Sequence, residues 1–276
     1  MGFNKQELRE KINKLPLFEK RDVFVANSTD EYEIEKTKQF QEAICEVGKN
    51  KAWAYVTPNY KLLQFNELFT PILDSIQEEV TGFLVSHGGF AALKFFPEID
   101  QLREGNDQFG LIAMNSVDKS SSIVVKFCVK HDERYFTIPS SVAGLRKPHT
   151  GKAADLTKNY IKFLGTVKET WKTVINKFPN YHITYEEGKI SEDEDIHYLQ
   201  FKSVADKLKL GVRMDKKVRE YYEQITLDDE TFSLWDFFMK VFELIEDLNF
   251  KSDAHKERRI DVLCKKLFEY SMILEL

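Results

Sequence analysis

The chain contains little cysteine. Its three cysteines, Cys45, Cys128 and Cys264, lie far apart, and none belongs to a CxxC pair. This number and spacing exclude a disulfide framework and a zinc knuckle, and they fit a reducing compartment. We therefore expect a cytoplasmic protein without structural disulfides.

The sequence also lacks long apolar runs. No stretch approaches the roughly 20 apolar residues that a membrane-spanning helix needs. The first residues, MGFNKQ, have no apolar signal core, and Gln6 stands where N-myristoylation needs Ser or Thr. We therefore expect a globular protein with no membrane partner, and its 42% of apolar residues can build a sizeable core.

The sequence matches the motif of a nucleotide-binding P-loop only in part. Gly144, Gly151 and Lys152 have the right residue types for this motif. Six residues separate the two glycines, however, and Ala153 stands where the motif needs a hydroxyl for Mg²⁺. These departures argue against nucleotide hydrolysis.

Catalytic and metal-binding patterns are equally scarce. Ser116 and Lys119 have the spacing of an SxxK dyad, but both lie in a predicted polar turn rather than on a helix. The six histidines include no HExxH pattern, and residues 131–133 are typical of a turn between strands. We expect no cofactor, no metal and no catalytic residue, unless a site converges in three dimensions around His87, His131 or Asp118.

Positive charge is concentrated in one segment. Residues 144–178 contain eight Lys or Arg side chains and two acidic ones, a net charge of +6 in a chain whose total is −5. A basic segment in an acidic protein is typical of a site for an anion, most often a phosphate backbone. A solvated helix face has a similar composition, so both interpretations stay open.

The same segment predicts an amphipathic helix over residues 153–178, with apolar residues on one side and lysines on the other. Ahead of it, Thr150 and Gly151 lead into a helix start whose free N–H groups favour an anion. We expect Tyr135, Phe136 and Tyr160 to lie near enough to stack on bases. The predicted nucleic-acid-binding residues are Arg146, Lys147, His149, Lys152, Lys158, Lys162, Lys168 and Lys172.

The order of the predicted elements indicates an α+β fold. Apolar runs at residues 80–85 and 90–96 flank the sequence SHGG and predict a hairpin. Runs at 111–114, 122–129 and 134–138 are joined by short polar stretches and predict antiparallel strands beside it. We expect an antiparallel sheet of about five strands with packed helices, followed by an all-helical C-terminal extension.

The N-terminal part predicts a mixture of helices and strands. Asn4 and Glu7 are spaced as a capping box for a short helix. Gly48 and the Pro58-Asn59 pair are typical of element ends and turns. We expect a strand at residues 23–26, a helix at 33–47, a strand at 52–57 and a helix capped by Asn66.

A change in composition predicts a domain boundary near residue 183. We expect an α+β core domain over residues 1–182 and a helical region over 183–276, with the acidic stretch after Glu186 as a loop. Residues 231–250 carry too much apolar surface for a lone helix in water, so this segment is buried in the fold or against a partner. A homo-oligomer formed through these aromatic C-terminal helices is one expectation.

Three sequence patterns follow one another in the first half of the chain. YKLLQFNELF begins at Tyr60, SHGGFAALKFFPEID at Ser86 and NSVDKSSSIVVKF at Asn115. In this order they resemble the core of a widespread phage/plasmid-like protein family of unassigned function. The resemblance covers about residues 50–180 and implies a phage or mobile-element origin without supplying a reaction.

The chain departs from that family at two places. Residues 131–135 replace a Cys-Asn pair, and Lys119 replaces a turn glycine, so whatever those positions do in the family does not carry over.

These observations favour a non-enzymatic phage or mobile-element protein. It would engage RNA, single-stranded DNA or a host nucleoprotein through the basic face between Arg146 and Lys172. Such a protein would serve recombination or replication, or inhibit a nucleic-acid-targeting defence such as a CRISPR effector in the host cytoplasm. The alternatives are an enzyme acting on nucleotides or nucleic acid, and an oligomeric scaffold protein.

Overall fold

The computed structural model describes residues 2–26, 34–36, 42–117, 123–139, 144–147, 160–209, 212–227, 231–250 and 252–274.

The chain folds as two compact units. The first comprises Met1–Tyr135 and Ala143–Phe163, and the second comprises Phe136–Val142 and Leu164–Leu276. These limits differ from the boundary predicted near residue 183, because part of the meander and most of the basic helix already contribute to the second core.

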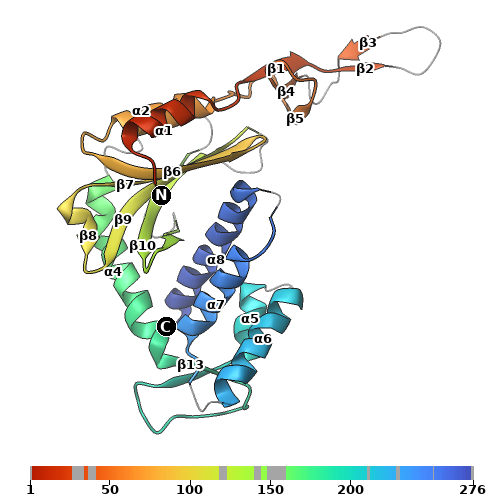
Figure 1. The fold of residues 1–276 in the computed structure, drawn as a ribbon. Coiled ribbons are helices and arrows are strands. Elements are labelled where there is room, and N and C mark those ends of the chain that lie inside the picture. Colours follow the sequence, from red (N-terminus) through yellow and green to blue (C-terminus); the bar gives the residue numbers. More distant parts are fainter. Residues whose placement is uncertain are drawn as a thin grey trace. The chain divides into compact units, whose positions relative to one another are not determined.

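An antiparallel sheet forms the centre of the first unit, with the strand order β11-β10-β9-β7-β6 (Figure 1). Two short strands lie off this path, β8 paired with β9 and β12 paired with β10. The α+β class, with an antiparallel sheet and C-terminal helices, is therefore confirmed. The strands are β6 (Val80–His87), β7 (Phe90–Pro97), β8 (Arg103–Glu104), β9 (Asp107–Ser116), β10 (Ile123–His131), β11 (Arg134–Thr137) and β12 (Gly144–Lys147).

Ring contacts show that this sheet curls into a half-barrel. Tyr135 lies on β11 at one end of the strand order, yet its ring centroid is 5.2 Å from that of Phe83 on β6 at the other end. The Phe96 ring on β7 is 5.4 Å from the same tyrosine. A flat sheet would hold strands that are four positions apart at nearly 20 Å. The curl therefore creates an inner face, which carries Phe83, Lys94, Phe96 and Tyr135.

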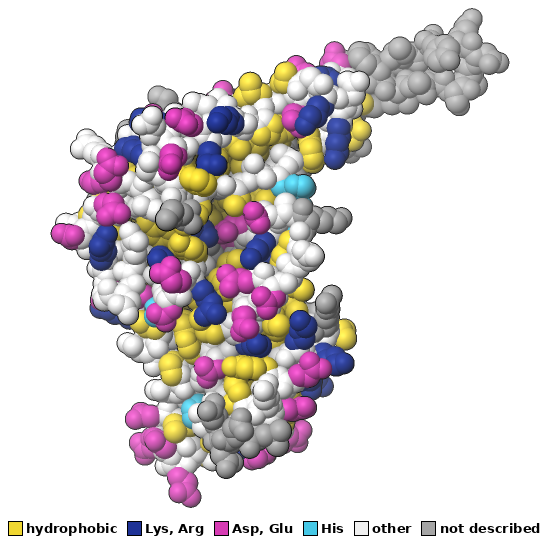
Figure 2. Space-filling model, in the orientation of Figure 1, with side chains coloured by type: hydrophobic (Ala, Val, Ile, Leu, Met, Phe, Trp, Pro, Cys, Tyr) yellow, Lys and Arg dark blue, Asp and Glu magenta, His cyan; other side chains and the backbone are white. Residues whose placement is uncertain are grey.

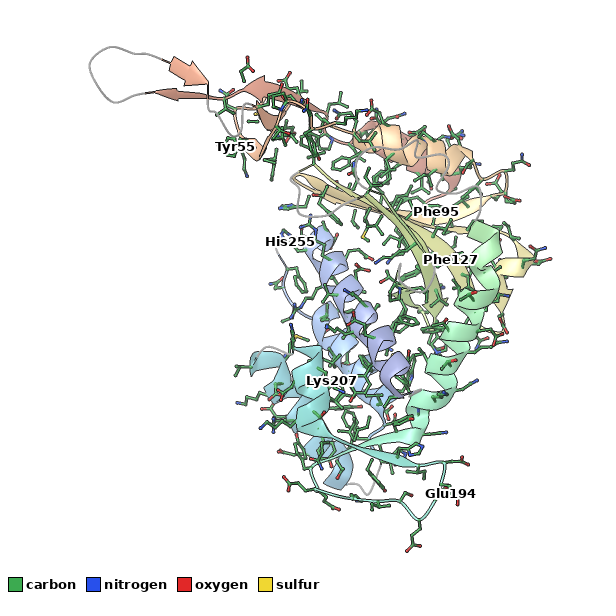
Figure 3. The ribbon with its side chains drawn as sticks, turned by 180° about the vertical axis from the view of Figure 1, so that it is seen from behind. Tyr55, Phe95, Phe127, Glu194, Lys207 and His255 are labelled. Atoms are coloured by element: carbon green, nitrogen blue, oxygen red, sulfur yellow. The ribbon has the colours of Figure 1, made fainter. Side chains whose placement is uncertain are left out.

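Two helices cover the outer face of the sheet, α1 (Lys5–Asn13) and α2 (Phe65–Asp74). Leu8 of α1 packs where Gly82 leaves room in β6. Asn115 Nδ2 donates a hydrogen bond to the Leu63 carbonyl just before α2, at 3.1 Å. Phe95 and Phe127, labelled in Figure 3, both pair with Leu111 in the sheet register and supply the apolar core of this face.

Capping of these two helices was partly predicted. Asn4 and Glu7 form the expected capping box of α1. The N-cap of α2 is Gln64, whose backbone N–H donates to Glu67 Oε2 at 2.8 Å. The prediction of Asn66 as the cap was wrong, because Gln64 also bonds the Phe18 backbone and so fixes the helix start two residues earlier.

The predicted helix over residues 33–47 was wrong. This stretch contains β3 (Ile34–Lys36) and β4 (Glu42–Glu46), and β4 pairs with β1 (Phe18–Asp22) on one side and β5 (Ala52–Val56) on the other. Its helix-forming Glu and Ala residues are overruled by pairing on both edges and by burial of Ile44. The strands expected at residues 23–26 and 52–57 are confirmed as β2 (Phe24–Ala26), which pairs with β3, and β5.

Helices dominate the second unit, but it also contains a small parallel pair of strands (Figure 1). The expectation of an all-helical C-terminal extension was therefore wrong, because this pair lies within it. The acidic stretch after Glu186 is the predicted loop, and it connects the two strands. The predicted basic helix ends at Lys177, one residue before its predicted end, and its predicted start lies outside the described residues. The elements are α4 (Tyr160–Lys177), β13 (Tyr181–Thr184), β14 (His197–Gln200), α5 (Phe201–Leu208), α6 (Val212–Leu227), α7 (Leu234–Glu246) and α8 (Asp253–Leu274).

Aromatic side chains fill the core of this unit. The Trp171 ring on α4 lies 5.1 Å from Phe136, 6.2 Å from Trp235 and 6.4 Å from Phe268. The apolar segment 231–250 is buried within the chain itself, which is the first of the two predicted possibilities, burial in the fold or against a partner. Within the described residues, no helix combines the length and apolarity needed to span a membrane.

Candidate nucleic-acid interface

The basic segment is only partly described by the structure. Arg146 and Lys147 belong to β12, where their backbones pair with Val124 and Ile123 of β10. The predicted basic loop therefore contains an edge strand of the sheet. His149, Lys152 and Lys158 lie outside the described residues, and Lys162 is described only by its backbone in α4.

Helix α4 has the two sides that the sequence predicts. Its apolar side, with Leu164, Val167 and Trp171, is buried. On the other side, the Lys172 side chain is 44% exposed and its Nζ lies 3.9 Å from Glu169 Oε1. Lys168 on the same helix is half-buried. On the face in Figure 2, described Lys and Arg side chains lie among Asp and Glu side chains.

A second group of basic and aromatic side chains lies on the inner face of the half-barrel. Lys94 Nζ lies 4.8 Å from the centroid of the Tyr135 ring, a cation–π contact. Lys94 itself is buried, whereas Tyr135 and Phe83 are only partly buried. The two rings therefore present aromatic surface that a ligand can reach, with a lysine beside it.

Further cations extend this inner face toward β12. Lys94 and Lys126 both pair with Ile112 in the register, so their side chains share the inner face and their strands lie about 10 Å apart. Lys126 in turn pairs with Gly144, the first residue of β12. The inner face thus adjoins the strand with which the basic segment begins.

Lys130 lies on the same side of β10 as Lys126, four residues further along the strand. Its Nζ donates a hydrogen bond to Glu133 Oε1 at 2.7 Å. This bond raises the pKa of Lys130 above its ordinary value.

No protein-family model matches the chain. No curated protein and no solved structure matches it either. Functional inference therefore depends on the chain's own residues.

Burial raises the pKa of Tyr135 above its ordinary value, although Lys130 and Lys94 act in the opposite direction. A raised pKa means that the folded protein favours the neutral phenol. The resulting stabilisation is present below the ordinary value of about 10 and is lost as pH rises above it.

We expect an absorbance titration of tyrosinate to show this directly. Replacing Tyr135 with Phe should remove one tyrosine from the group that ionises latest. The midpoints of the exposed tyrosines should stay where they are. Loss of an early-ionising tyrosine would instead place the Tyr135 hydroxyl in water and contradict its burial.

A histidine on β10 makes the closest approach to catalytic geometry. His131 Nδ1 lies 2.6 Å from Asp107 Oδ1, and its Nε2 lies 3.4 Å from Asp132 Oδ2. His87 pairs with Phe90, at the end of the sheet where β9 finishes, whereas Asp107 begins β9. The two histidines are therefore separated by about 30 Å of strand. They do not form one site, and Asp118 lies outside the described residues.

Metal ligands are also not gathered. Among the described residues, no three His, Cys, Asp or Glu side chains lie close enough together to hold a metal ion.

Sequence reasoning found Tyr135 but missed Lys94 and misplaced Phe136. Phe136 is 2% exposed and packs against Trp171, so it cannot stack on a base. Successive strand residues point to opposite faces, and this alternation separates the two aromatic neighbours. The Tyr160 side chain is not described. The sequence feature that could have indicated Lys94 is that it is the single lysine inside the apolar run of β7.

Proposed function

We propose that this chain is a non-enzymatic protein that binds single-stranded nucleic acid, alone or within a host nucleoprotein. The bases would stack on the rings of Phe83 and Tyr135, and the phosphates would meet Lys130 and strand β12, with the Lys94 ammonium supplying positive charge behind the Tyr135 ring. Proteins that bind single strands commonly combine aromatic rings with lysines. Such binding tolerates many sequences and weakens with salt.

One observation carries the proposal, the partly exposed Tyr135 ring with the Lys94 ammonium over its face. A nucleobase has a π-face that can extend this stack, and its phosphate has the charge that the lysines attract. The concentration of positive charge in residues 144–178 supports the same class of ligand.

The resemblance to a phage/plasmid-like family supports a mobile-element origin. A protein of that origin that binds nucleic acid or nucleoprotein would act in replication or recombination, or would obstruct a host defence such as a CRISPR effector. We favour the defence inhibitor, because obstruction needs a binding surface and no reaction.

The test is fluorescence anisotropy with labelled single-stranded RNA, single-stranded DNA and duplex DNA at low and near-physiological salt. We expect the single strands to bind more tightly than the duplex. The Tyr135→Ala variant should lose about tenfold in affinity, since stacking on one aromatic contributes about 1 to 3 kcal/mol. The Lys158→Glu/Lys162→Glu double variant should bind more weakly and with a smaller salt dependence.

Controls separate binding from folding. Tyr135→Phe keeps the ring and should retain affinity, and Lys94→Met keeps the aliphatic stem but should weaken binding. A Lys49→Glu/Lys216→Glu variant carries the same charge change at side chains that are 63% and 77% exposed, and it should bind nearly as wild type. Absence of binding to any strand at low salt, in a protein with a normal circular dichroism spectrum, would disprove the proposal.

A further inference from the structure

A cavity of about 120 Å³ opens between the last four helices. Its apolar lining comes from the end of α5 (Leu208), the start of α6 (Met214), the later part of α7 (Val241 and Ile245) and the middle of α8 (Leu263). We call it the α5–α8 pocket. Cavities of comparable volume take up one benzene-sized apolar group.

Three cations surround this apolar lining, namely Lys209, Arg259 and Lys266. Lys266 is hydrogen-bonded to Glu269 at 3.1 Å. Lys209 and Arg259 are exposed and form no ion pair with any other residue that the structure describes. The pocket therefore suits an apolar group that has carboxylates beside it.

Two exposed valines belong to the helices that line the pocket. Val262 on α8 lines the pocket and is 49% exposed, and Val212 at the start of α6 is 89% exposed. A small molecule would fill the pocket and leave them in water. A polypeptide segment would cover them, so we take the ligand to be a protein chain.

The same unit carries a segment with the matching chemistry. The loop of residues 185–196 joins β13 to β14 and exposes Ile190 by 89%. It holds one lysine, Lys189, and six carboxylates around the isoleucine: Glu186, Glu187, Glu192, Asp193, Glu194 and Asp195.

Local contacts hold this acidic loop in shape. At its start, the Tyr185 ring stacks on Phe201 at 4.8 Å, and burial raises the pKa of Tyr185 to about 12. After Ile190, Ser191 Oγ accepts from the Asp193 backbone N–H at 3.0 Å. An ordered loop loses less entropy on binding than a disordered one.

We propose that Ile190 of one copy inserts into the α5–α8 pocket of a second copy, with the carboxylates of its loop meeting Lys209, Arg259 and Lys266. An isoleucine side chain is smaller than the benzene-sized group that such a cavity accommodates. The opposite charges of the loop and the pocket rim steer the two copies together.

The loop and the pocket of a single copy are at opposite ends of α5. The loop leads through β14 to Phe201 at the start of this helix, whereas the pocket is lined by Leu208 at its end, about 10 Å further on. Figure 3 shows Glu194 in the loop well apart from Lys207 on α5. The loop therefore fills another copy's pocket, and such a head-to-tail contact repeats into rings or open chains.

The experiment is sedimentation velocity over a wide range of protein concentration. Wild type should form species that grow beyond dimers as concentration rises and that shrink with salt. A loop variant, Ile190→Asp, and a pocket variant, Arg259→Glu, should each weaken self-association at least tenfold. Their mixture should form a 1:1 pair and nothing larger, because each pair then retains one intact loop and one intact pocket.

Ile190→Val and Lys217→Glu are the matched controls, and both should assemble as wild type. A synthetic peptide of residues 185–196 should dissociate the wild-type assemblies. A wild-type monomer at every concentration would overturn the proposal, even if the peptide binds, because the pocket would then serve a different acidic protein. Assembly that survives both variants would also overturn it.

Discussion

Replacing Trp171 with Ala should lower the free energy of unfolding by about 3 to 5 kcal/mol, the largest stability loss that we expect from one side chain. Trp171 is 1% exposed, and its ring touches aromatic partners from β11, α7 and α8. Its removal would leave a cavity at the point where these elements meet. Urea unfolding followed by far-ultraviolet circular dichroism measures the change.

Two variants calibrate this result. Trp171→Phe keeps most of the apolar volume and should cost clearly less than Trp171→Ala. Thr166→Ala lies on the exposed side of the same helix and should change stability by less than about 0.5 kcal/mol. If Trp171→Ala behaved like Thr166→Ala, α4 would not be packed on the second core at all.

Gly110→Ala should destabilise the first unit by about 3 kcal/mol. A Cβ at this position would lie 2.5 Å from the Phe95 carbonyl oxygen and 2.6 Å from the Phe96 ring, closer than real Cβ contacts. The carbonyl belongs to a paired strand and cannot move cheaply. Phe96 would be displaced, and Tyr135 packs against it, so nucleic-acid affinity should fall along with stability.

A glycine in helix α4 provides a matched control. Gly165 lies on α4, and a Cβ there would meet nothing within 4 Å. Gly165→Ala should therefore stabilise the helix by about 0.5 to 1 kcal/mol. Thermal unfolding of both variants side by side provides the measurement. Equal and small effects would mean that β7 and β9 do not approach each other as closely as the structure shows.

The strongly periodic parts of the fold could be predicted from the sequence. The hairpin around Gly88, the meander and helix α4 follow from spacing and turn residues that act locally. Residues 33–47 misled because their composition favours a helix, while pairing of β4 with two distant strands decides the outcome. The parallel pair β13 and β14 leaves almost no local signal, since each strand has four residues.

The candidate site was less predictable for a geometric reason. Tyr135 and Phe83 are 52 positions apart in sequence, and only the curl of the sheet brings their rings together. The same curl places Lys94 beside the Tyr135 ring. The predicted basic residues belong to a contiguous segment, whereas the inner face is assembled from β6, β7, β10 and β11.

The order of the two units along the chain has a consequence for synthesis. Phe136 and Trp171 belong to the second core, but their partners Trp235 and Phe268 come much later in the sequence. During synthesis, the strands of the sheet leave the ribosome first. These two large apolar side chains then stay exposed to solvent until α7 and α8 have been synthesised. The nascent chain is therefore most prone to misassociate at this stage, when chaperones would bind its exposed apolar side chains.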